Sequence, residues 1–544
     1  MVIRRDRVDF GRDKFTGYCN APLTSTCSVV CQSYKKIVSE GKQNRTRKPV
    51  QLFHDALVSF AERRVILMKH FSIFLKQFRH FPIGKCLLLI LLIYIILLTA
   101  PYLSHKKVPD AYQKNFQPDA CYSSSAGTER VAYINDNDDA LLYRLHMFDQ
   151  AQKEIILSTF DFNADKSGKD VLSALIDASK RGVSVRVIVD GMSGLLDMQG
   201  NPYFQAFASY PNVSVKIYNK VNLLKPYDIQ ARLHDKYVII DQKMYLLGGR
   251  NTDNRFLGSY SKAQNIDREL FVYNTVESDE STSITELRSY FERVWNLKDS
   301  KDYLCKKMTS KIETAKQELE EHSVDLKQTF SDAYTEWNYE EITLETNRVT
   351  LLSNPIGTKN KEPLLWYSLQ KLMEHSEQVT IYTPYIICGK EMYQGFYDLN
   401  KLNIPVEIIT NDVSSGANPW GCTDYLNQKE KIWDTGVKVY EFMGGHSCHT
   451  KALLLDDRMS IVGSYNFDMR STYQDTELML AVDCPELNAI IRQETEYDKT
   501  CSKIMGPDGD YIYGEHYKPK NLTFGKQLFY AVLRVITIPI RRFL

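Results

Sequence analysis

Through most of the chain, short apolar runs alternate with amphipathic stretches in the order expected of an α/β protein. The first half predicts helices at 138–152 and 169–180, and strands at 154–160, 183–190 and 213–218. The strand at 183–190 (VSVRVIVD) is strongly marked, because β-branched residues alternate in it and Arg181-Gly182 supplies a turn before it. This order predicts a βαβ-type unit.

The same order of elements returns in the second half of the chain. Helices are predicted at 364–375, 391–399 and 424–434, and strands at 379–383, 406–410 and 437–442. Two stretches with matching element order indicate an internal repeat. We therefore predict an α/β fold with two tandem repeats, at 112–297 and 346–505, each a mixed β-sheet flanked by helices.

Two further segments lie outside these repeats. Residues 298–345 are charged and helical by composition, and predict a connector or appended helix with a solvated face. The tail at 506–544 ends in an amphipathic segment, Phe524–Leu544, that mixes bulky apolar residues with Lys and Arg. This segment either docks on the core as a last helix or lies in a membrane interface.

An uncharged run of 18 residues, Cys86–Leu103, precedes the repeats. Its length and uniform apolarity predict a transmembrane anchor at 84–104, and it lacks the small-x-small site of the alternative, a cleaved signal peptide. Before Cys86 there are 17 Lys and Arg against 6 Asp and Glu. This excess predicts a basic, irregular tail at 1–80 and a single-pass protein of the cell membrane, with a cytoplasmic N-terminus and an extracytoplasmic catalytic part.

The composition mainly argues against certain partners and metal sites. The 544 residues carry a net charge of +1, and no basic-aromatic track surrounds the motifs described below, so no nucleic acid is expected as a partner. Eleven cysteines are scattered without zinc spacing, and no carboxylate cage for Mg²⁺ is evident. No metal or cofactor is predicted.

One short string carries the candidate chemistry. It contains His234, Lys236 and Asp241, followed by Gly248-Gly-Arg-Asn251. The string returns 215 positions later, with every offset unchanged, as His449, Lys451, Asp456 and Gly463-Ser-Tyr-Asn466. A lone His-x-Lys is usually a surface accident, but an identical duplication inside a repeated fold indicates two halves of one active site.

These residue types suit a tetrahedral anion. In an extended chain residues i and i+2 project from the same face, so each histidine projects together with its lysine. Asn251 and Asn466 add amide donors, and the small residues Gly249 and Ser464 let the backbone come close to a phosphate. Two histidines on either side of a phosphodiester permit in-line displacement: one forms a phosphohistidine, and the other protonates the leaving alkoxide and then activates the acceptor.

Carboxylates near each motif have different expected roles. A nucleophilic imidazole needs an acceptor on its other nitrogen, and we assign Glu269 and Glu477 to this role. They align in the strings Asp267-Arg-Glu269 and Asp475-Thr-Glu477. Asp241 and Asp456, seven residues from their histidines, are expected to fix a turn or a neighbouring lysine rather than touch substrate.

The duplicated string resembles the signature of the phospholipase D superfamily. Over roughly 135–500 the chain further resembles bacterial cardiolipin synthases of the C type, in Asp165-Lys-Ser-Gly168, in TPY at 383–385 and in GSYNFDMRS from Gly463. The segment Pro419–Tyr425 departs from the pattern of that family. The resemblance implies two phospholipase D-like repeats with a pseudo-two-fold active site.

It also implies an activity. His234 and His449 would be the catalytic pair, with superfamily habit favouring His234 as nucleophile, and the lysines and asparagines of both motifs would bind phosphate. The implied reaction is transfer of a phosphatidyl group from phosphatidylglycerol to a second phospholipid, giving cardiolipin at a membrane. Two alternatives stay open: a phospholipase D that releases phosphatidic acid, and a membrane-tethered nuclease of the same fold. The acceptor, the role of residues 1–80 and the oligomeric state are left open.

Overall fold

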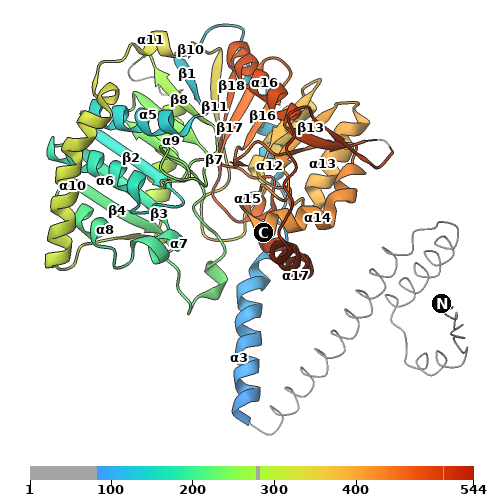
Figure 1. Cartoon of the computed structure of the whole chain (residues 1–544), viewed down its shortest axis with the longest axis horizontal. Coiled ribbons are helices and arrows are strands. Elements are labelled where there is room, and N and C mark those ends of the chain that lie inside the picture. Colours follow the sequence, from blue (N-terminus) through green and yellow to red (C-terminus); the bar gives the residue numbers. More distant parts are fainter. Residues whose placement is uncertain (1–81, 277–281, 507) are drawn as a thin grey trace, which may run out of the picture. The chain divides into compact units, whose positions relative to one another are not determined.

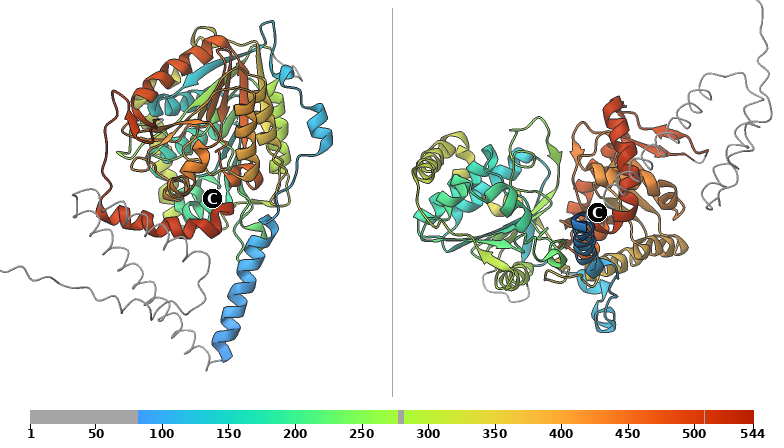
Figure 2. Two further views of the ribbon diagram at one scale, coloured as in Figure 1. Left: turned by 90° about the vertical axis from the view of Figure 1, so that its right-hand side faces the viewer. Right: turned by 90° about the horizontal axis from the view of Figure 1, so that it is seen from below.

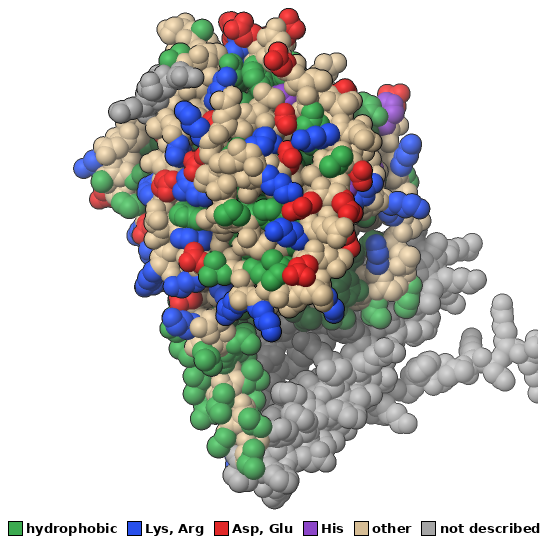
Figure 3. Space-filling view, turned by 90° about the vertical axis from the view of Figure 1, so that its left-hand side faces the viewer, with side chains coloured by type: hydrophobic (Ala, Val, Ile, Leu, Met, Phe, Trp, Pro, Cys, Tyr) green, Lys and Arg blue, Asp and Glu red, His purple; other side chains and the backbone are tan. Residues whose placement is uncertain are grey.

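The computed structural model describes residues 82–276, 282–506 and 508–544, so the predicted tail at 1–80 lies outside the described residues. The chain divides into a unit that ends at Ile93 and a catalytic unit, Tyr94–Leu544, that contains both repeats. Helix α3 (Pro82–Thr99) is apolar on all sides, and Figure 3 shows its hydrophobic side chains exposed. The stretch Ile83–Tyr102, with mean hydropathy 2.6, is long and apolar enough to cross a membrane.

The first repeat is a nine-stranded mixed sheet with the order β10-β1-β8-β6-β5-β2-β3-β4-β9. Its strands are β1 (Glu129–Ile134), β2 (Glu154–Thr159), β3 (Ser184–Asp190), β4 (Val213–Tyr218), β5 (Tyr237–Ile240), β6 (Met244–Gly248), β8 (Glu269–Asn274), β9 (Ser300–Asp302) and β10 (Leu344–Glu345). Strands β2, β3 and β4 are parallel, and the remaining pairs are antiparallel. One face is covered by α5 (Asn137–Gln150), α6 (Lys166–Lys180), α8 (Pro202–Phe207) and α10 (Ser310–Thr329), whose apolar residues form one core with the sheet.

The second repeat has the order β11-β18-β17-β16-β12-β13-β14-β19-β20, which repeats eight strands of the first sheet and places its ninth strand at the opposite edge. Its strands are β11 (Arg348–Ser353), β12 (Val379–Tyr382), β13 (Val406–Asn411), β14 (Lys438–Phe442), β16 (Ala452–Leu455), β17 (Met459–Gly463), β18 (Leu478–Asp483), β19 (Ser502–Met505) and β20 (Tyr511–Tyr513). Helices α12 (Leu364–Glu374), α13 (Lys390–Lys401) and α14 (Pro419–Trp433) pack on its outer side. The prediction of two mixed α/β repeats is confirmed.

The two repeats lie side by side, as Figures 1 and 2 show, and share a hydrophobic core. Residues from the inner faces of both sheets pack together with α9 (Ser283–Trp295) and α16 (Pro485–Thr500). A short parallel ladder between β7 (Asn265–Ile266) and β15 (Ser447–Cys448) adds backbone hydrogen bonds between the repeats. Since β15 immediately precedes His449, this ladder fixes the second motif against the first repeat.

Residues 298–345 belong structurally to the first repeat. They supply the edge strands β9 and β10, and α10 packs on α6 and α8 through a buried apolar stripe. The stripe consists of Ile312, Ala315, Leu319 and Leu326. The charged positions between these residues face outward, in line with the solvated face that the sequence predicts. In the C-terminal tail, α17 (Phe524–Ile540) docks on α14.

Candidate active site

Each motif forms a β-hairpin in which the histidine and the aspartate lie at opposite ends of the first strand. Asp241, with a positive φ of 51°, accepts hydrogen bonds at 2.6–2.9 Å from the backbone N–H groups of residues 152–154. Asp456, with φ of 50°, accepts at 2.8 and 3.0 Å from those of residues 377–378. Both aspartates therefore fix the chain where β2 and β12 begin, away from the histidines.

Both histidines line one cavity of about 470 Å³ between the repeats. Asn251 and Asn466 line the same cavity, and Lys236 and Lys451 are buried at 2% and 1% exposure. The Oδ1 atom of Asn466 is buried and has no hydrogen-bond partner among the described residues. The structure thus brings the histidines, lysines and asparagines of the two motifs together.

His234, from the first repeat, is oriented by a carboxylate of the second. Its Nδ1 lies 2.8 Å from Oε1 of Glu477, and its backbone N–H donates to Oγ1 of Thr476 at 3.1 Å. The Glu477 carboxylate also accepts hydrogen bonds from the hydroxyls of Ser464 (2.5 Å) and Ser471 (2.6 Å). Because Glu477 occupies Nδ1 of His234, Nε2 is the ring nitrogen available to the cavity.

His449 is oriented in the reciprocal way, by the first repeat. Its Nδ1 lies 2.6 Å from Oδ2 of Asp267, and its backbone N–H donates to the carbonyl of Ile266 at 2.7 Å. The assignment of Glu269 to this role is wrong: Glu269 is 1% exposed and forms a bidentate pair with Arg144 at 2.6 and 2.8 Å. Each histidine therefore depends on a carboxylate of the opposite repeat.

Asp267 and Glu477 play the same role but do not occupy aligned positions in the two motifs. Two residue differences between the motifs explain this. Gly249 stands where the second motif has Ser464, and a Cβ at Gly249 would lie 2.6 Å from both carboxylate oxygens of Asp267. Arg250 stands where the second motif has Tyr465. Its buried guanidinium lies 3.7 Å from the Glu269 carboxylate, and neither residue lines the cavity. The glycine therefore admits Asp267, while Arg250 and Arg144 hold Glu269 elsewhere.

Burial and the two lysines set the charge state of the site. Burial, reinforced by Lys236, lowers the pKa of His234 well below its usual value. Burial and Lys451 lower the pKa of His449 to about 3, so both imidazoles are neutral near pH 7. Burial also lowers the pKa of Lys451 to about 8 and raises that of Glu477 to about 8. Burial alone would raise the pKa of Asp267, but Lys451 and His449 hold it below its ordinary value.

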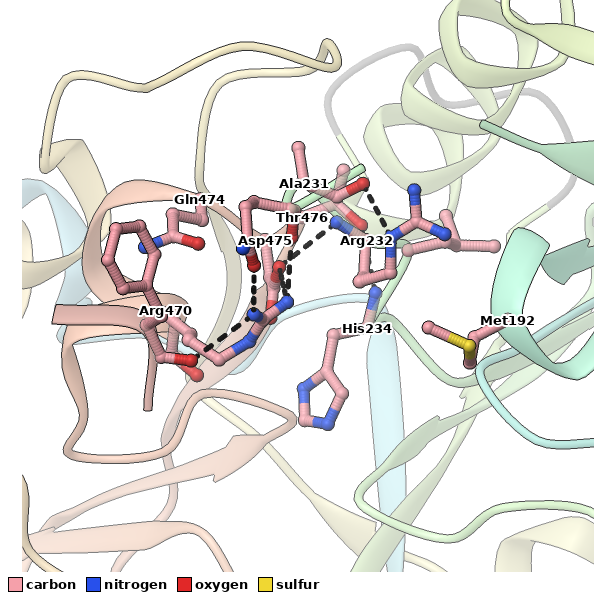
Figure 4. Close-up of polar contacts among 12 residues, drawn as sticks. Met192, Ala231, Arg232, His234, Arg470, Gln474, Asp475 and Thr476 are labelled. Carbon is pink, nitrogen blue, oxygen red and sulfur yellow. Dashed lines mark hydrogen bonds and ion pairs between the residues drawn. The ribbon is translucent and has the colours of Figure 1, made fainter. Parts of the chain in front are cut away.

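A pair of arginines at the cavity was missed by the sequence analysis. Arg470 donates to Asp475 at 3.1 Å and to the carbonyl of Gln230 at 2.7 Å, which joins the second motif to the loop before His234. Figure 4 shows the imidazole of His234 next to this cluster. Arg255 lines the same cavity. Each arginine follows its motif asparagine by four residues, in Asn-x-Asp-x-Arg, and this shared extension of the two strings is the signal that could have found them.

Residues Pro419–Tyr425, which differ from the family pattern, form the first turns of α14. Asn418 caps the helix through the N–H groups of Trp420 and Gly421, and lines the cavity. Asp424 points to Arg541 of the C-terminal tail at 2.8 Å. None of residues 419–425 lines the cavity of the histidines; Asn418, just before the segment, does.

The chain is similar to several known proteins. The family model "Cardiolipin synthase, PLD-like domain" matches residues 145–295 and 369–499, slightly more than half of the chain. Cardiolipin synthase C of Escherichia coli K12 is 23% identical over 428 residues, covering 72% of this chain and 89% of that protein. An uncharacterised protein of Helicobacter pylori 26695 is 26% identical over 403 residues, covering 66% of this chain and 77% of that protein.

Among solved structures, phosphatidylserine synthase of Haemophilus influenzae matches with a TM-score of 0.55 at 13% identity, covering 80% of this chain and 99% of that chain, which supports the fold. The family model matches both halves of the chain, and each matched half contains one complete histidine motif. The chain therefore belongs to the cardiolipin synthase-like family of phosphatidyltransferases in the phospholipase D superfamily.

Proposed function

We propose that the protein synthesises cardiolipin by transferring a phosphatidyl group from one phosphatidylglycerol to another through a phosphohistidine. The observation that carries this proposal is the reciprocal pairing of each cavity-lining histidine with a buried carboxylate of the opposite repeat. Such pairing leaves one nitrogen of each ring available on either side of a phosphodiester.

In the first step, Nε2 of His234 attacks phosphorus and forms a P–N bond, while the bond from phosphorus to the glycerol headgroup oxygen breaks. His449 donates a proton to that oxygen, and glycerol leaves. Asp267 supports the imidazolium form of His449, because its own pKa is held low. The phosphate anion offsets the charge of Lys236 and Lys451, which removes one cause of the low pKa of His449 and lets it carry the proton.

In the second step, His449 takes the proton from a glycerol hydroxyl of the second phosphatidylglycerol. That oxygen attacks phosphorus, the P–N bond breaks, and its electron pair returns to His234. Lys236, Lys451 and the amides of Asn251 and Asn466 would hold the phosphate oxygens through both steps. The unpaired Oδ1 atom of Asn466 supports a site that a ligand completes.

Transfer rather than hydrolysis is supported by the names of the relatives, a cardiolipin synthase and a phosphatidylserine synthase. The test is a product assay with the purified full chain and phosphatidylglycerol, analysed by mass spectrometry. We expect cardiolipin and glycerol in equal amounts. Phosphatidic acid as the main product would replace the proposal with a phospholipase D. Cleavage of single-stranded DNA without lipid turnover would replace it with a nuclease.

We further propose that α3 anchors the enzyme in the cell membrane, with a cytoplasmic N-terminus and an extracytoplasmic catalytic unit. The length and hydropathy of the helix support the anchor, and the excess of Lys and Arg before Cys86 supports this direction. Figure 3 shows acidic and basic side chains intermixed on the visible face of the catalytic unit, which is unlike the basic track of a nuclease.

We expect kcat/KM to depend on pH as a bell with its maximum near pH 8. Below pH 8 the Glu477 carboxyl becomes protonated and donates to Nδ1 of His234, so the proton of the ring sits on Nε2 and blocks attack. Above pH 8 Lys451 loses its charge and with it the stabilisation of the phosphate. Initial rates between pH 5.5 and 10 measure both limbs.

The Lys451→Arg variant provides the control for this profile. Because arginine stays charged, the alkaline limb should move above pH 10, whatever the maximal rate of the variant. A wild-type profile that is flat from pH 6 to 8 would exclude the His234–Glu477 pair as the origin of the acidic limb.

A further inference from the structure

Helix α17 presents its apolar side away from the protein. Its buried residues, Tyr530, Leu533 and Thr537, form a narrow stripe against α14. Most of the remaining surface consists of exposed large hydrophobics: Phe524, Leu528, Phe529, Val532, Val535, Ile536 and Ile538, which are 43–81% exposed. A surface helix in water normally buries such a face, so an apolar patch of this extent indicates a binding surface.

Polar contacts fix this orientation of α17. Arg534 donates from Nε to Oδ1 of Asn427 at 2.8 Å, and the amide of Asn427 donates to Oγ1 of Thr537 at 3.2 Å. Just after the helix, Arg541 pairs with Asp424 at 2.8 Å. These side chains all lie on the α14 side of the helix. The outward direction of the apolar face therefore follows from specific contacts.

Charge favours a lipid surface over a second copy of the chain. From His516 to Leu544 there are six Lys and Arg and no Asp or Glu. They are Lys518, Lys520, Lys526, Arg534, Arg541 and Arg542. Arg541 is paired with Asp424 and Arg534 contacts Asn427 on the α14 side, so the excess available to a partner comes from the other four. Anionic phospholipids attract such a segment, whereas two copies of it packed together would bring like charges close to each other.

The position of α17 in the catalytic unit also favours a lipid surface as its partner. Arg542, just beyond the helix, donates to the carbonyl of Leu103, and Tyr102 donates to the carbonyl of Tyr227 at 3.2 Å. Tyr102 follows the end of α3 by three residues, a reach of about 10 Å. If α3 spans a bilayer, as the proposed function holds, the end of α17 must lie close to the bilayer surface. Leu224, near Tyr227, is also 89% exposed.

A mostly apolar cavity lies between this surface and the site and shares lining residues with the cavity of the histidines. It measures about 310 Å³ and is lined by Trp420, Ile540 and Phe543. Tyr385, Asn418 and Arg470 line both this cavity and the one that holds the histidines. A lipid that leaves the bilayer beside α17 would therefore keep its acyl chains among apolar side chains while its phosphate approaches His234.

We propose that α17 is an interfacial helix that inserts its exposed face among the acyl chains of an anionic phospholipid bilayer, beside the entrance to the active site. This proposal rests on the proposed function for the choice of a lipid bilayer as the partner.

The test uses the full chain in proteoliposomes that contain phosphatidylglycerol with a photoactivatable diazirine on an acyl chain. After illumination, lipid adducts are mapped by peptide mass spectrometry. We expect adducts in 524–540 and, as an internal positive control, in α3. The double variant V532E/V535E should lose the adducts in α17 and keep those in α3. Val324→Glu is the matched control, because Val324 is 59% exposed on α10 against 61% for Val535, and it should keep both sets.

Adducts in α3 without adducts in α17 would overturn the proposal. So would crosslinks between two copies through α17, detected on the same sample, because they would assign the face to a second chain. Absence of adducts from both helices would refute the anchor together with this inference. Adducts in α17 from an enzyme that makes no cardiolipin would refute the proposed reaction and leave the interfacial helix standing.

Discussion

Replacing His234 with alanine should lower kcat for the proposed cardiolipin formation by about 10⁴-fold or more, because the variant would have no group to form the proposed phosphohistidine. Replacing His449 with alanine has a comparable effect, since the leaving alkoxide then departs without a proton. The effects of the two variants should not add when combined, because both histidines act on one reaction path. Turnover is measured as release of labelled glycerol from phosphatidylglycerol.

The two variants differ in what accumulates on the enzyme. His449→Ala retains the nucleophile, so a phosphatidyl adduct on His234 should be detectable by mass spectrometry after long incubation. An adduct on His449 in the His234→Ala variant would reverse the two roles. His446→Ala is the matched control: His446 is exposed, lies three residues before His449 and should be dispensable. A His234→Ala variant with normal turnover would refute the paired-histidine mechanism.

Replacing Glu477 with glutamine lowers kcat by about 10³- to 10⁴-fold with little change in Tm. The amide keeps the shape of the side chain but removes the charge that stabilises the correct tautomer of His234. Asp267→Asn should act in the same way on His449. Activity of the folded variants and Tm from thermal unfolding separate the chemical effect from a loss of stability.

Glu269→Gln is the informative comparison, because the two motif strings align Glu269 with Glu477. It breaks a buried ion pair with Arg144 and should destabilise the fold by about 3–5 kcal/mol, while the folded fraction keeps its kcat. If Glu269→Gln instead lost kcat at unchanged Tm, and Asp267→Asn stayed active, the assignment of carboxylates from the structure would be refuted.

The fold could be predicted in large part because the central strands are strongly patterned. The strands expected at 154–160, 183–190 and 213–218 are β2, β3 and β4, with ends that agree within one residue. Strands β1 and β11 were not predicted. Each pairs antiparallel with a strand more than 120 residues away, and such long-range partners leave little trace in local periodicity.

The residue types of the site could be predicted from the sequence, but the carboxylate that contacts each histidine could not. Identical offsets identify the histidines, lysines and asparagines, and alignment of the strings favours Glu269 as the counterpart of Glu477. The pairing depends on what surrounds each carboxylate: the space above Gly249 admits Asp267, and the guanidiniums of Arg144 and Arg250 retain Glu269. The differences at Gly249 and Arg250 decide which carboxylate contacts His449. The sequence does not show this, because the effect depends on neighbours that are distant along the chain.

The exchange of carboxylates between the repeats also governs when the enzyme can act during its own synthesis. Glu477 follows His234 by 243 residues, so a nascent chain carries its nucleophile long before the group that orients it exists. Under the proposed function, a partly made or truncated chain that retains α3 and the first repeat would be anchored but inactive, because it lacks the carboxylate that orients His234. The proposed reaction on surrounding phospholipids would then begin only after the second repeat has folded against the first.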